Sequence, residues 1–230
     1  MPLTGKIPTD KPWVIITCEL PQCQVLSNGA LDAGKAAGVP TKLLSYKTTD
    51  GTTLTSAMKQ ALTFKPIAVS PVGFSQAVWQ SLIPQYKSAG VIITSIALGD
   101  NAEVPGVVTT GSGSQLDYNA SGKVMADFVT ADSNANAHVL VQDVPAFAVL
   151  KAFGDGFKAE LPKACKACKI TPLDLAPAQL STNSLVPGII AALQKDKSIK
   201  YLVATDGAFL VGISAALKAA GLNGIKIVGG

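Results

Sequence analysis

The chain has 230 residues and a formal net charge of +4, with 48% hydrophobic and 15% charged residues. All nineteen basic residues are lysine, and arginine is absent. Functions that depend on a guanidinium group, such as bidentate clamps on carboxylates or phosphates, are therefore excluded. The low charged fraction and the high apolar fraction are typical of a folded chain with large buried cores, and the length allows one domain or two.

Basic residues gather densely in only one place, residues 163–169, and more loosely at residues 195–200. Proteins that bind nucleic acids usually concentrate basic side chains on one face and interleave them with aromatic ones. Aromatic residues make up only 6% of this chain, so both clusters are interpreted as solvated faces. We therefore expect no nucleic-acid partner.

One uncharged stretch, residues 66–86, is long enough to cross a bilayer. It contains prolines and several serine and glutamine residues, so we do not interpret it as a transmembrane helix. The first dozen residues are polar and interrupted by proline, which does not fit a signal peptide. We interpret them as the N-terminus of a mature or trimmed protein, so the lack of a signal does not place the protein in the cytoplasm.

Short apolar, β-branched runs recur at nearly even intervals, and segments with helical spacing separate most of them. Strands joined by helices of this length are parallel neighbours, and both faces of such a sheet are covered. The predicted fold class is therefore α/β with doubly wound parallel sheets. The expected strands are residues 13–17, 42–46, 67–71, 91–98, 138–142, 169–175, 201–205 and 225–230, and the clearest helices are residues 52–62, 78–83, 147–161 and 208–220.

The alternation of strands and helices is interrupted once, at residues 99–113, where no helix separates two extended pieces. Four strand–helix units precede this break, and four strands follow it. We therefore predict two doubly wound lobes, residues 1–105 and 106–230, with a hinge near residues 103–110.

Residues for catalysis or metal binding are sparse. His138 is the only histidine, and it lies at the N-terminal end of an expected strand, whereas ligands of open parallel sheets gather at the carboxyl ends. Glu19 and Asp206 follow strands at those carboxyl ends, but nothing in their spacing requires a paired general acid and base. Glycine-rich phosphate-binding motifs are absent. We therefore predict no enzyme activity, no catalytic residues, no cofactor and no metal site.

The four cysteines form two close pairs. Cys165 and Cys168 lie at the end of an expected helix, whereas a thioredoxin-like site needs such a pair at a helix N-terminus. We favour two local disulfides, Cys165 with Cys168 and Cys18 with Cys23, which would fit an oxidising compartment. Four reduced, partly buried cysteines are the alternative.

Several short motifs occur in a specific order along the chain. They are Pro21 with Gly29-Ala30, Ser70-Pro71, Asp117-Tyr118 with Gly122, Gly154-Asp155-Gly156-Phe157, Thr205-Asp206 with Gly212, and Ile227-Val228-Gly229. Over residues 13–230 this order resembles the sugar-type periplasmic solute-binding proteins, the family of ribose-binding protein and of the effector domains of lac-repressor-type regulators. In that family further strands and helices follow the last motif, so the resemblance implies a C-terminally truncated chain.

The resemblance implies an extracytoplasmic solute-binding protein of an ABC importer, in which a small ligand binds between the lobes and closes a hinge. The implied partners are that ligand and an ABC permease, and the protein would be a monomer without a membrane span. The implied location is periplasmic or extracellular, and a lipid anchor before trimming is left open. Two alternatives remain, the effector-binding or sensory domain of a regulator and an α/β enzyme.

The ligand positions implied by the resemblance depart from those of ribose-type proteins. Two stacking aromatic positions hold Gln22 and Cys23 here, and the second-lobe arginine corresponds to Lys151. A sugar hydroxyl left without a buried partner costs ~1–3 kcal/mol, so we expect a smaller or less polar ligand, aromatic or cationic, in place of the family's sugar. The residues expected to bind it are Glu19, Gln22, Phe74, Asn101, Tyr118, Phe147, Lys151, Thr205 and Asp206.

Overall fold

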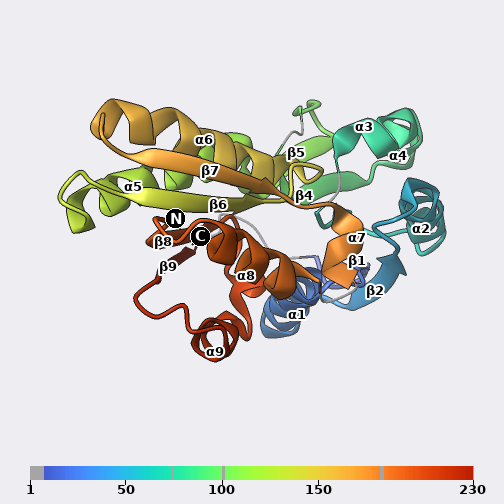
Figure 1. Cartoon of the computed structure of the whole chain (residues 1–230). Coiled ribbons are helices and arrows are strands. Elements are labelled where there is room, and N and C mark those ends of the chain that lie inside the picture. Colours follow the sequence, from blue (N-terminus) through green and yellow to red (C-terminus); the bar gives the residue numbers. More distant parts are fainter. Residues whose placement is uncertain (1–7, 74, 100–101, 182–183, 230) are drawn as a thin grey trace. The chain divides into compact units, whose positions relative to one another are not determined.

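The structure is a computed structural model that describes residues 8–73, 75–99, 102–181 and 184–229. The chain divides into two compact units, Met1–Ser114 and Gln115–Gly230. Each unit contains one parallel sheet with helices between its strands (Figure 1). The predicted fold class, α/β with two doubly wound parallel sheets, is confirmed.

The sheet of the first unit has the strand order β2-β1-β3-β4-β5, and every neighbouring pair is parallel. Its strands are β1 (Trp13–Cys18), β2 (Thr41–Tyr46), β3 (Ala68–Pro71), β4 (Ile92–Gly99) and β5 (Val108–Ser114). The helices are α1 (Pro21–Ala36), α2 (Gly51–Thr63), α3 (Gln76–Trp79), the 3-10 turn η1 (Gln80–Leu82) and α4 (Ile83–Ala89). Strand β1 lies inside the sheet, and its residues Val14, Ile15 and Ile16 are fully buried, as the continuous apolar run predicts.

Local sequence signals explain where α2 and α4 begin and end. Asp50 accepts a hydrogen bond from the Thr52 N–H at 2.9 Å, which satisfies one of the free donors at the start of α2. Pro84 lies in the first turn of α4, where its missing N–H breaks no helical hydrogen bond. Gly90 ends α4 with a φ of 64°, a left-handed conformation that only glycine adopts without strain.

The sheet of the second unit has the order β7-β6-β8-β9, again with only parallel neighbours. Its strands are β6 (His138–Asp143), β7 (Lys169–Asp174), β8 (Tyr201–Ala204) and β9 (Lys226–Gly229). The helices are α5 (Gln115–Asp132), α6 (Ala148–Ala164), α7 (Pro177–Ser181), α8 (Leu185–Lys195), the 3-10 turn η2 (Gly207–Leu210) and α9 (Ile213–Ala219). Val139 and Val141 pack against α5 and α6 on one face, and Leu140 packs against α8 and α9 on the other.

Helices α5 and α6 pack closely because glycine replaces a side chain at their contact. A Cβ at Gly122 of α5 would collide with the carbonyl oxygen of Phe153, and a Cβ at Gly156 of α6 would collide with the carbonyl oxygen of Asn119. The two glycines let the helix backbones approach, while Phe153 and Phe157 fill the core beneath. Gly122 and Gly156, which belong to two of the short sequence motifs, therefore have a packing role.

The structure divides two segments that were each expected as one helix. Residues 78–83 run from the end of α3 through η1 to the first residue of α4. The segment expected as one helix at residues 208–220 is the turn η2 followed by α9, because Gly212 between them has a φ of 80°. Residues 108–114, after the break in the alternation, form β5 and pair with β4. The first unit therefore extends to Ser114, later than the expected division after residue 105. The hinge near residues 103–110 stays a prediction.

Candidate functional site

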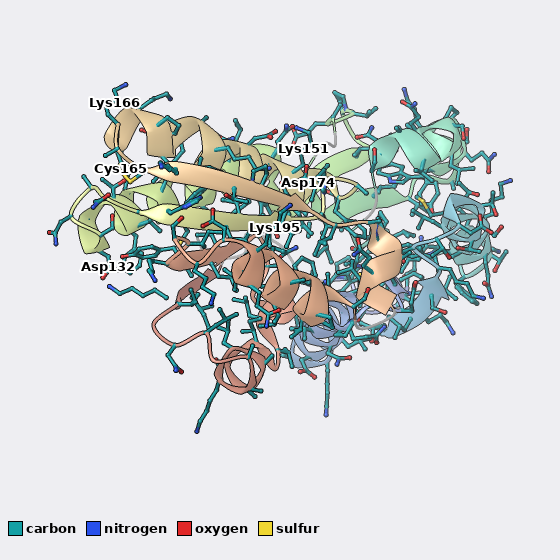
Figure 2. The ribbon with its side chains drawn as sticks, in the orientation of Figure 1. Asp132, Lys151, Cys165, Lys166, Asp174 and Lys195 are labelled. Carbon is teal, nitrogen blue, oxygen red and sulfur yellow. A yellow bond between two sulfur atoms is a disulfide. The ribbon has the colours of Figure 1, made fainter. Side chains whose placement is uncertain are left out.

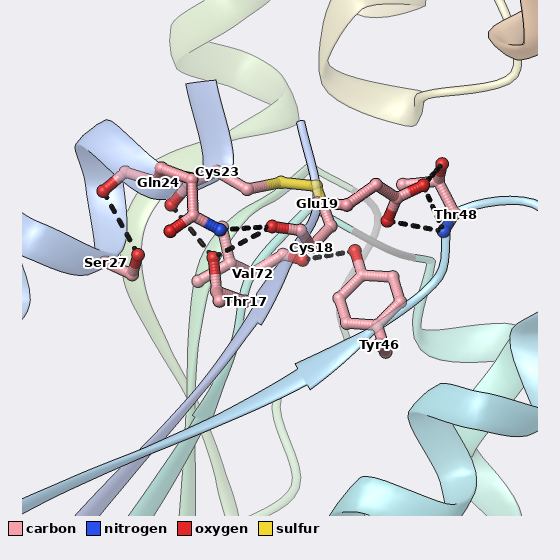
Figure 3. The surroundings of a disulfide bond; sticks show 9 residues. All are labelled: Thr17, Cys18, Glu19, Cys23, Gln24, Ser27, Tyr46, Thr48 and Val72. Atoms are coloured by element: carbon pink, nitrogen blue, oxygen red, sulfur yellow. Dashed lines mark hydrogen bonds between the residues drawn. A yellow bond between two sulfur atoms is a disulfide. The ribbon is translucent and has the colours of Figure 1, made fainter. Parts of the chain in front are cut away.

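The turn between β1 and α1 is closed by a disulfide. Cys18 ends β1, Cys23 lies in the first turn of α1, and the two are joined across a Cα–Cα distance of 5.4 Å (Figure 3). Thr17 Oγ1 donates to the Cys23 carbonyl at 3.1 Å, and Gln24 Nε2 donates to the Cys18 carbonyl at 2.6 Å. Both cysteines are buried, so this turn is held covalently as well as by hydrogen bonds.

Glu19, inside this closed turn, contacts the loop between β2 and α2. The Thr48 N–H lies 3.2 Å and 3.1 Å from the two carboxylate oxygens, and the Thr48 hydroxyl donates to Oε1 at 2.7 Å (Figure 3). A carboxylate accepts about four hydrogen bonds, so Glu19 keeps room for one further donor. Gln22 lies half-buried in the first turn of α1, next to the disulfide.

Tyr46, the last residue of β2, holds the loop after β3 close to the Cys18–Cys23 disulfide. Its hydroxyl donates to the Val72 carbonyl at 2.7 Å. Burial raises the pKa of Tyr46, and the nearby Glu19 carboxylate raises it further. A Cβ at Gly73 would lie 3.5 Å from Cys23 Sγ and 3.6 Å from the Tyr46 hydroxyl oxygen. The loops that follow β1, β2 and β3 therefore meet around the disulfide.

The carboxyl edge of the second sheet contains a buried ion pair. Asp143 ends β6 with only 1% of its side chain exposed, and Lys158 Nζ of α6 lies 3.1 Å from its Oδ2. The same ammonium lies 3.7 Å from Asp174 Oδ1 at the end of β7. Burial raises the pKa of Asp143, and Lys158 opposes that rise. A Cβ at Gly154 would collide with Asp143 Oδ2, so this glycine makes room for the carboxylate.

Phe147 and Lys151 occupy the start of α6. Phe147 is the residue before the helix, and it packs against a buried cluster that includes Val144 and Phe209. Lys151 is exposed and pairs with Asp155 one turn later at 2.5 Å, which raises the pKa of Lys151. Phe147 therefore supplies apolar surface at this edge, while the charge of Lys151 is balanced by its neighbour.

Thr205 and Asp206 follow β8. Asp206 Oδ1 accepts a hydrogen bond from the Ala208 N–H at 2.7 Å and so begins the turn η2. Burial raises the pKa of Asp206, and the Asp206 carboxylate in turn adds to the rise in the pKa of Tyr118, whose main cause is burial. The Tyr118 ring packs against the same buried cluster as Phe147.

Buried polar atoms without hydrogen-bond partners concentrate at this second edge. Among the described residues six buried side-chain atoms have none, and four of them belong to Gln142, Asp143 and Thr205. Gln142 pairs in register with Ala204, so Asp143 at the end of β6 and Thr205 just after β8 lie on neighbouring strands at the same edge. An unsatisfied buried polar group costs ~1–3 kcal/mol, and a ligand or an ordered water would remove that cost.

The structure places seven of the nine expected ligand-binding residues at carboxyl edges of the sheets. Glu19 and Gln22 lie at the edge of the first sheet, and Tyr118, Phe147, Lys151, Thr205 and Asp206 lie at the edge of the second. Phe74 and Asn101 lie outside the described residues. Sequence reasoning did not single out Asp143 or Tyr46, although an acidic residue that ends a buried apolar strand is a usable signal for the first of them.

The opposite edge of the second sheet holds the remaining candidates. His138 Nδ1 lies 2.7 Å from Ser198 Oγ, and its Nε2 lies 2.9 Å from Thr171 Oγ1, so both ring nitrogens are hydrogen-bonded. The second disulfide, Cys165–Cys168, lies at the amino end of β7, whereas Asp174 lies at the carboxyl end of that strand (Figure 2). The described residues contain no group of three or more side chains arranged to hold a metal ion.

No family model matches the chain, and no curated protein matches its sequence. Solved structures match it over nearly its whole length. An ABC sugar transporter subunit from Rhodobacter sphaeroides 2.4.1 superposes with a TM-score of 0.74 at 19% identity, covering 96% of this chain and 78% of that one. The fold is that of periplasmic solute-binding proteins.

Two further solute-binding proteins with bound small molecules show the same likeness. One, from Actinobacillus succinogenes 130z with bound D-allose, has a TM-score of 0.79 at 15% identity and covers 96% of this chain and 77% of its own. The other is the 5-methylthioribose transporter solute-binding protein from Thermotoga lettingae TMO in complex with 5-methylthioribose. It has a TM-score of 0.78 at 16% identity, and the match covers 96% of this chain and 69% of that one. These similar structures are transport proteins, not enzymes. Among the described residues, none of the helices has the length and hydrophobicity needed to cross a membrane.

Proposed function

We propose that this chain is the extracytoplasmic solute-binding component of an ABC importer. The observation that carries the proposal is that each of two parallel-sheet units gathers polar and aromatic side chains at its carboxyl edge, in the fold of periplasmic solute-binding proteins. Ligands of open α/β sheets bind at such edges. The protein would work as a monomer that delivers its ligand to an ABC permease.

The ligand is proposed to bind between the two units, with a hinge near residues 103–110. A ligand that touches both edges favours a closed state, because only that state makes both sets of contacts. The proposed contacts from the described residues are Glu19, Gln22, Tyr118, Phe147, Lys151, Thr205 and Asp206, and Phe74 and Asn101 complete the proposed set.

The proposed ligand is less polar than a simple pentose or hexose. An aromatic group or a positive charge on the ligand would suit the residues of the site. Phe147 and Tyr118 offer ring surface, and the half-buried Asp206 carboxylate accepts only one hydrogen bond from the described residues. Lys151 is already paired with Asp155. The chain has no arginine to donate several hydrogen bonds to sugar hydroxyls. One of the similar proteins is named for 5-methylthioribose, a sugar in which a methylthio group replaces a hydroxyl.

The test begins with the ligand itself. Mass spectrometry of small molecules released by denaturing the purified protein identifies what co-purifies, and a thermal-shift screen compares simple pentoses and hexoses with 5-methylthioribose and aromatic amines. We expect 5-methylthioribose or an aromatic amine to stabilise the protein. At a free ligand concentration of about 100 times the dissociation constant, the free energy of unfolding should rise by ~2–3 kcal/mol. Strong stabilisation by common pentoses or hexoses would refute the proposed ligand class, although not the solute-binding function.

Two variants separate binding from folding. Asp206→Asn removes a half-buried carboxylate of the proposed site, whereas Asp127→Asn removes an exposed carboxylate on α5. The first variant should weaken the best ligand at least ~10-fold, because a charge-assisted hydrogen bond is worth ~1.5–3 kcal/mol, and the second should not. Small-angle X-ray scattering should show compaction when that ligand binds. No stabilising ligand and no compaction in any condition would count against the solute-binding function as a whole.

A further inference from the structure

The disulfide at the β1–α1 turn and the Glu19–Thr48 contact lie next to each other at the carboxyl edge of the first sheet (Figure 3). We infer that the Cys18–Cys23 disulfide and Glu19 are positioning groups, which together hold the β2–α2 loop in place through Thr48. Cys18, Glu19, Cys23 and Thr48 are called the loop clasp below. The clasp would pre-organise the ligand-binding loops, a consequence that rests on the proposed function.

The turn between β1 and α1 needs such support because its helix start has no side-chain cap. Leu20 occupies the cap position and makes no side-chain hydrogen bond, and Pro21 follows it. Serine, threonine, aspartate or asparagine at this position would have held the first turn through the backbone N–H groups. The disulfide replaces that function: it joins the last residue of β1 to the first turn of α1 across the turn.

Glu19 follows Cys18 directly, so the disulfide restricts where the Glu19 backbone can go. The carboxylate reaches a residue 29 positions away in sequence, where it accepts from both the N–H and the hydroxyl of Thr48. These contacts are exposed to solvent, and an exposed hydrogen bond between two free loops contributes little, because ordering both loops costs entropy. Because the disulfide has already ordered the β1–α1 turn, the Glu19–Thr48 contact has to order only the β2–α2 loop.

The start of α2 provides an internal reference. Asp50 accepts from the N–H of Thr52, two residues along the chain, at 2.9 Å, and this bond depends on neither the disulfide nor Glu19. Opening the clasp should therefore release the Thr48 amide and leave the Thr52 amide protected. A general loss of stability would affect both amides alike.

The second disulfide provides a matched control. Cys18–Cys23 has a sequence separation of 5 and Cys165–Cys168 one of 3, so both close short loops with similar loop-closure entropy. The second one lies in the other unit, at the amino edge of its sheet. Cys165→Ala/Cys168→Ala therefore has a comparable effect on the unfolded chain without touching the clasp.

The experiment measures amide hydrogen exchange by NMR, without ligand, in the wild type and the two double variants. In Cys18→Ala/Cys23→Ala we expect the Thr48 amide to exchange about 10-fold faster and the Thr52 amide to change less than about 3-fold. In the control variant, Thr48 should also change less than about 3-fold. Unchanged Thr48 exchange in the first variant, or equal acceleration in the control, would overturn the inference.

Substitutions of Glu19 test whether the disulfide acts through this residue. With the disulfide intact, Thr48 exchange should be fastest in Glu19→Ala, slower in Glu19→Gln, which keeps one acceptor oxygen, and slowest in the wild type. Adding Glu19→Ala to Cys18→Ala/Cys23→Ala should accelerate Thr48 little further, since the clasp is already open; full additivity would contradict the inference. If the cysteine variant does not fold, the Glu19 series still tests the part of the inference that concerns Glu19, and equal Thr48 exchange in Glu19→Ala and the wild type would overturn it. No ligand is involved, so failure of the clasp and failure of the proposed function are distinguishable.

Discussion

Lys158→Met tests the buried ion pair of the second unit. The substitution removes the ammonium that faces the Asp143 carboxylate and keeps most of the aliphatic stem. Removing one partner of a buried pair typically costs about 3–5 kcal/mol, because an uncompensated charge remains inside. Asp143 is 1% exposed, but Lys158 is 28% exposed, so water screens part of the interaction. We expect unfolding at pH 7 to require about 2–3 kcal/mol less free energy in the variant.

The pH dependence of this loss has a defined sign. Burial raises the pKa of Asp143 and Lys158 opposes the rise, so the variant should raise that pKa further. Between the unfolded and the folded pKa, the folded state then binds more protons, and the free energy of unfolding falls as pH increases. The deficit of the variant should therefore be small below about pH 4, near the unfolded pKa of aspartate, and grow toward pH 7.

Urea denaturation of the wild type and the variant at pH 4 and pH 7 measures both quantities. Lys163→Met is the matched control, because Lys163 is 67% exposed and pairs with Glu160 on the helix surface, and it should cost about 0–0.5 kcal/mol. Adding Asp143→Asn to Lys158→Met should recover most of the loss, since no buried charge remains. A Lys158→Met deficit that is absent at pH 7, or equal at the two pH values, would refute the reasoning.

Other predictions concern the glycines and the disulfides. Gly122→Ala should destabilise the protein by about 1–3 kcal/mol, because the added methyl group would meet the backbone of α6, whereas Gly29→Ala in α1 meets no atom within 4 Å and should stabilise by about 0.5–1 kcal/mol. Thermal or urea unfolding checks both, and equal effects would contradict the packing argument. Thiol titration under denaturing, non-reducing conditions should find none of the four cysteines free, and loss of either disulfide should cost about 2 kcal/mol of stability. Four titratable thiols would contradict both disulfides.

Much of the fold could be predicted because its signals are local. The buried run of β1 and the Asp50 cap of α2 lie within a few residues of the elements that they specify. The helix expected at residues 208–220 was misjudged because its apolar spacing continues through Gly212, whose backbone conformation spacing does not reveal. Strand β5 was hard to recognise because no helix separates it from β4.

The candidate site was less predictable. Residues that follow strands, such as Glu19 and Asp206, could be assigned to carboxyl edges from topology alone. The hydrogen-bond partners of these residues could not be predicted, since Thr48 lies 29 positions from Glu19 and nothing in the sequence pairs them. The pairing of Asp143 with Lys158 could not be predicted either, because the two residues lie on different elements.

The alternation of strands and helices, the absence of guanidinium chemistry and the two candidate cysteine pairs can all be read from the sequence, because periodicity, composition and close spacing need no knowledge of the packed structure. Two features become visible only in the folded protein: three loops meet around the Cys18–Cys23 disulfide, and the Asp143 carboxylate lies buried against α6. These features depend on which backbones approach closely enough to exclude water, and that is settled when the sheets and helices pack.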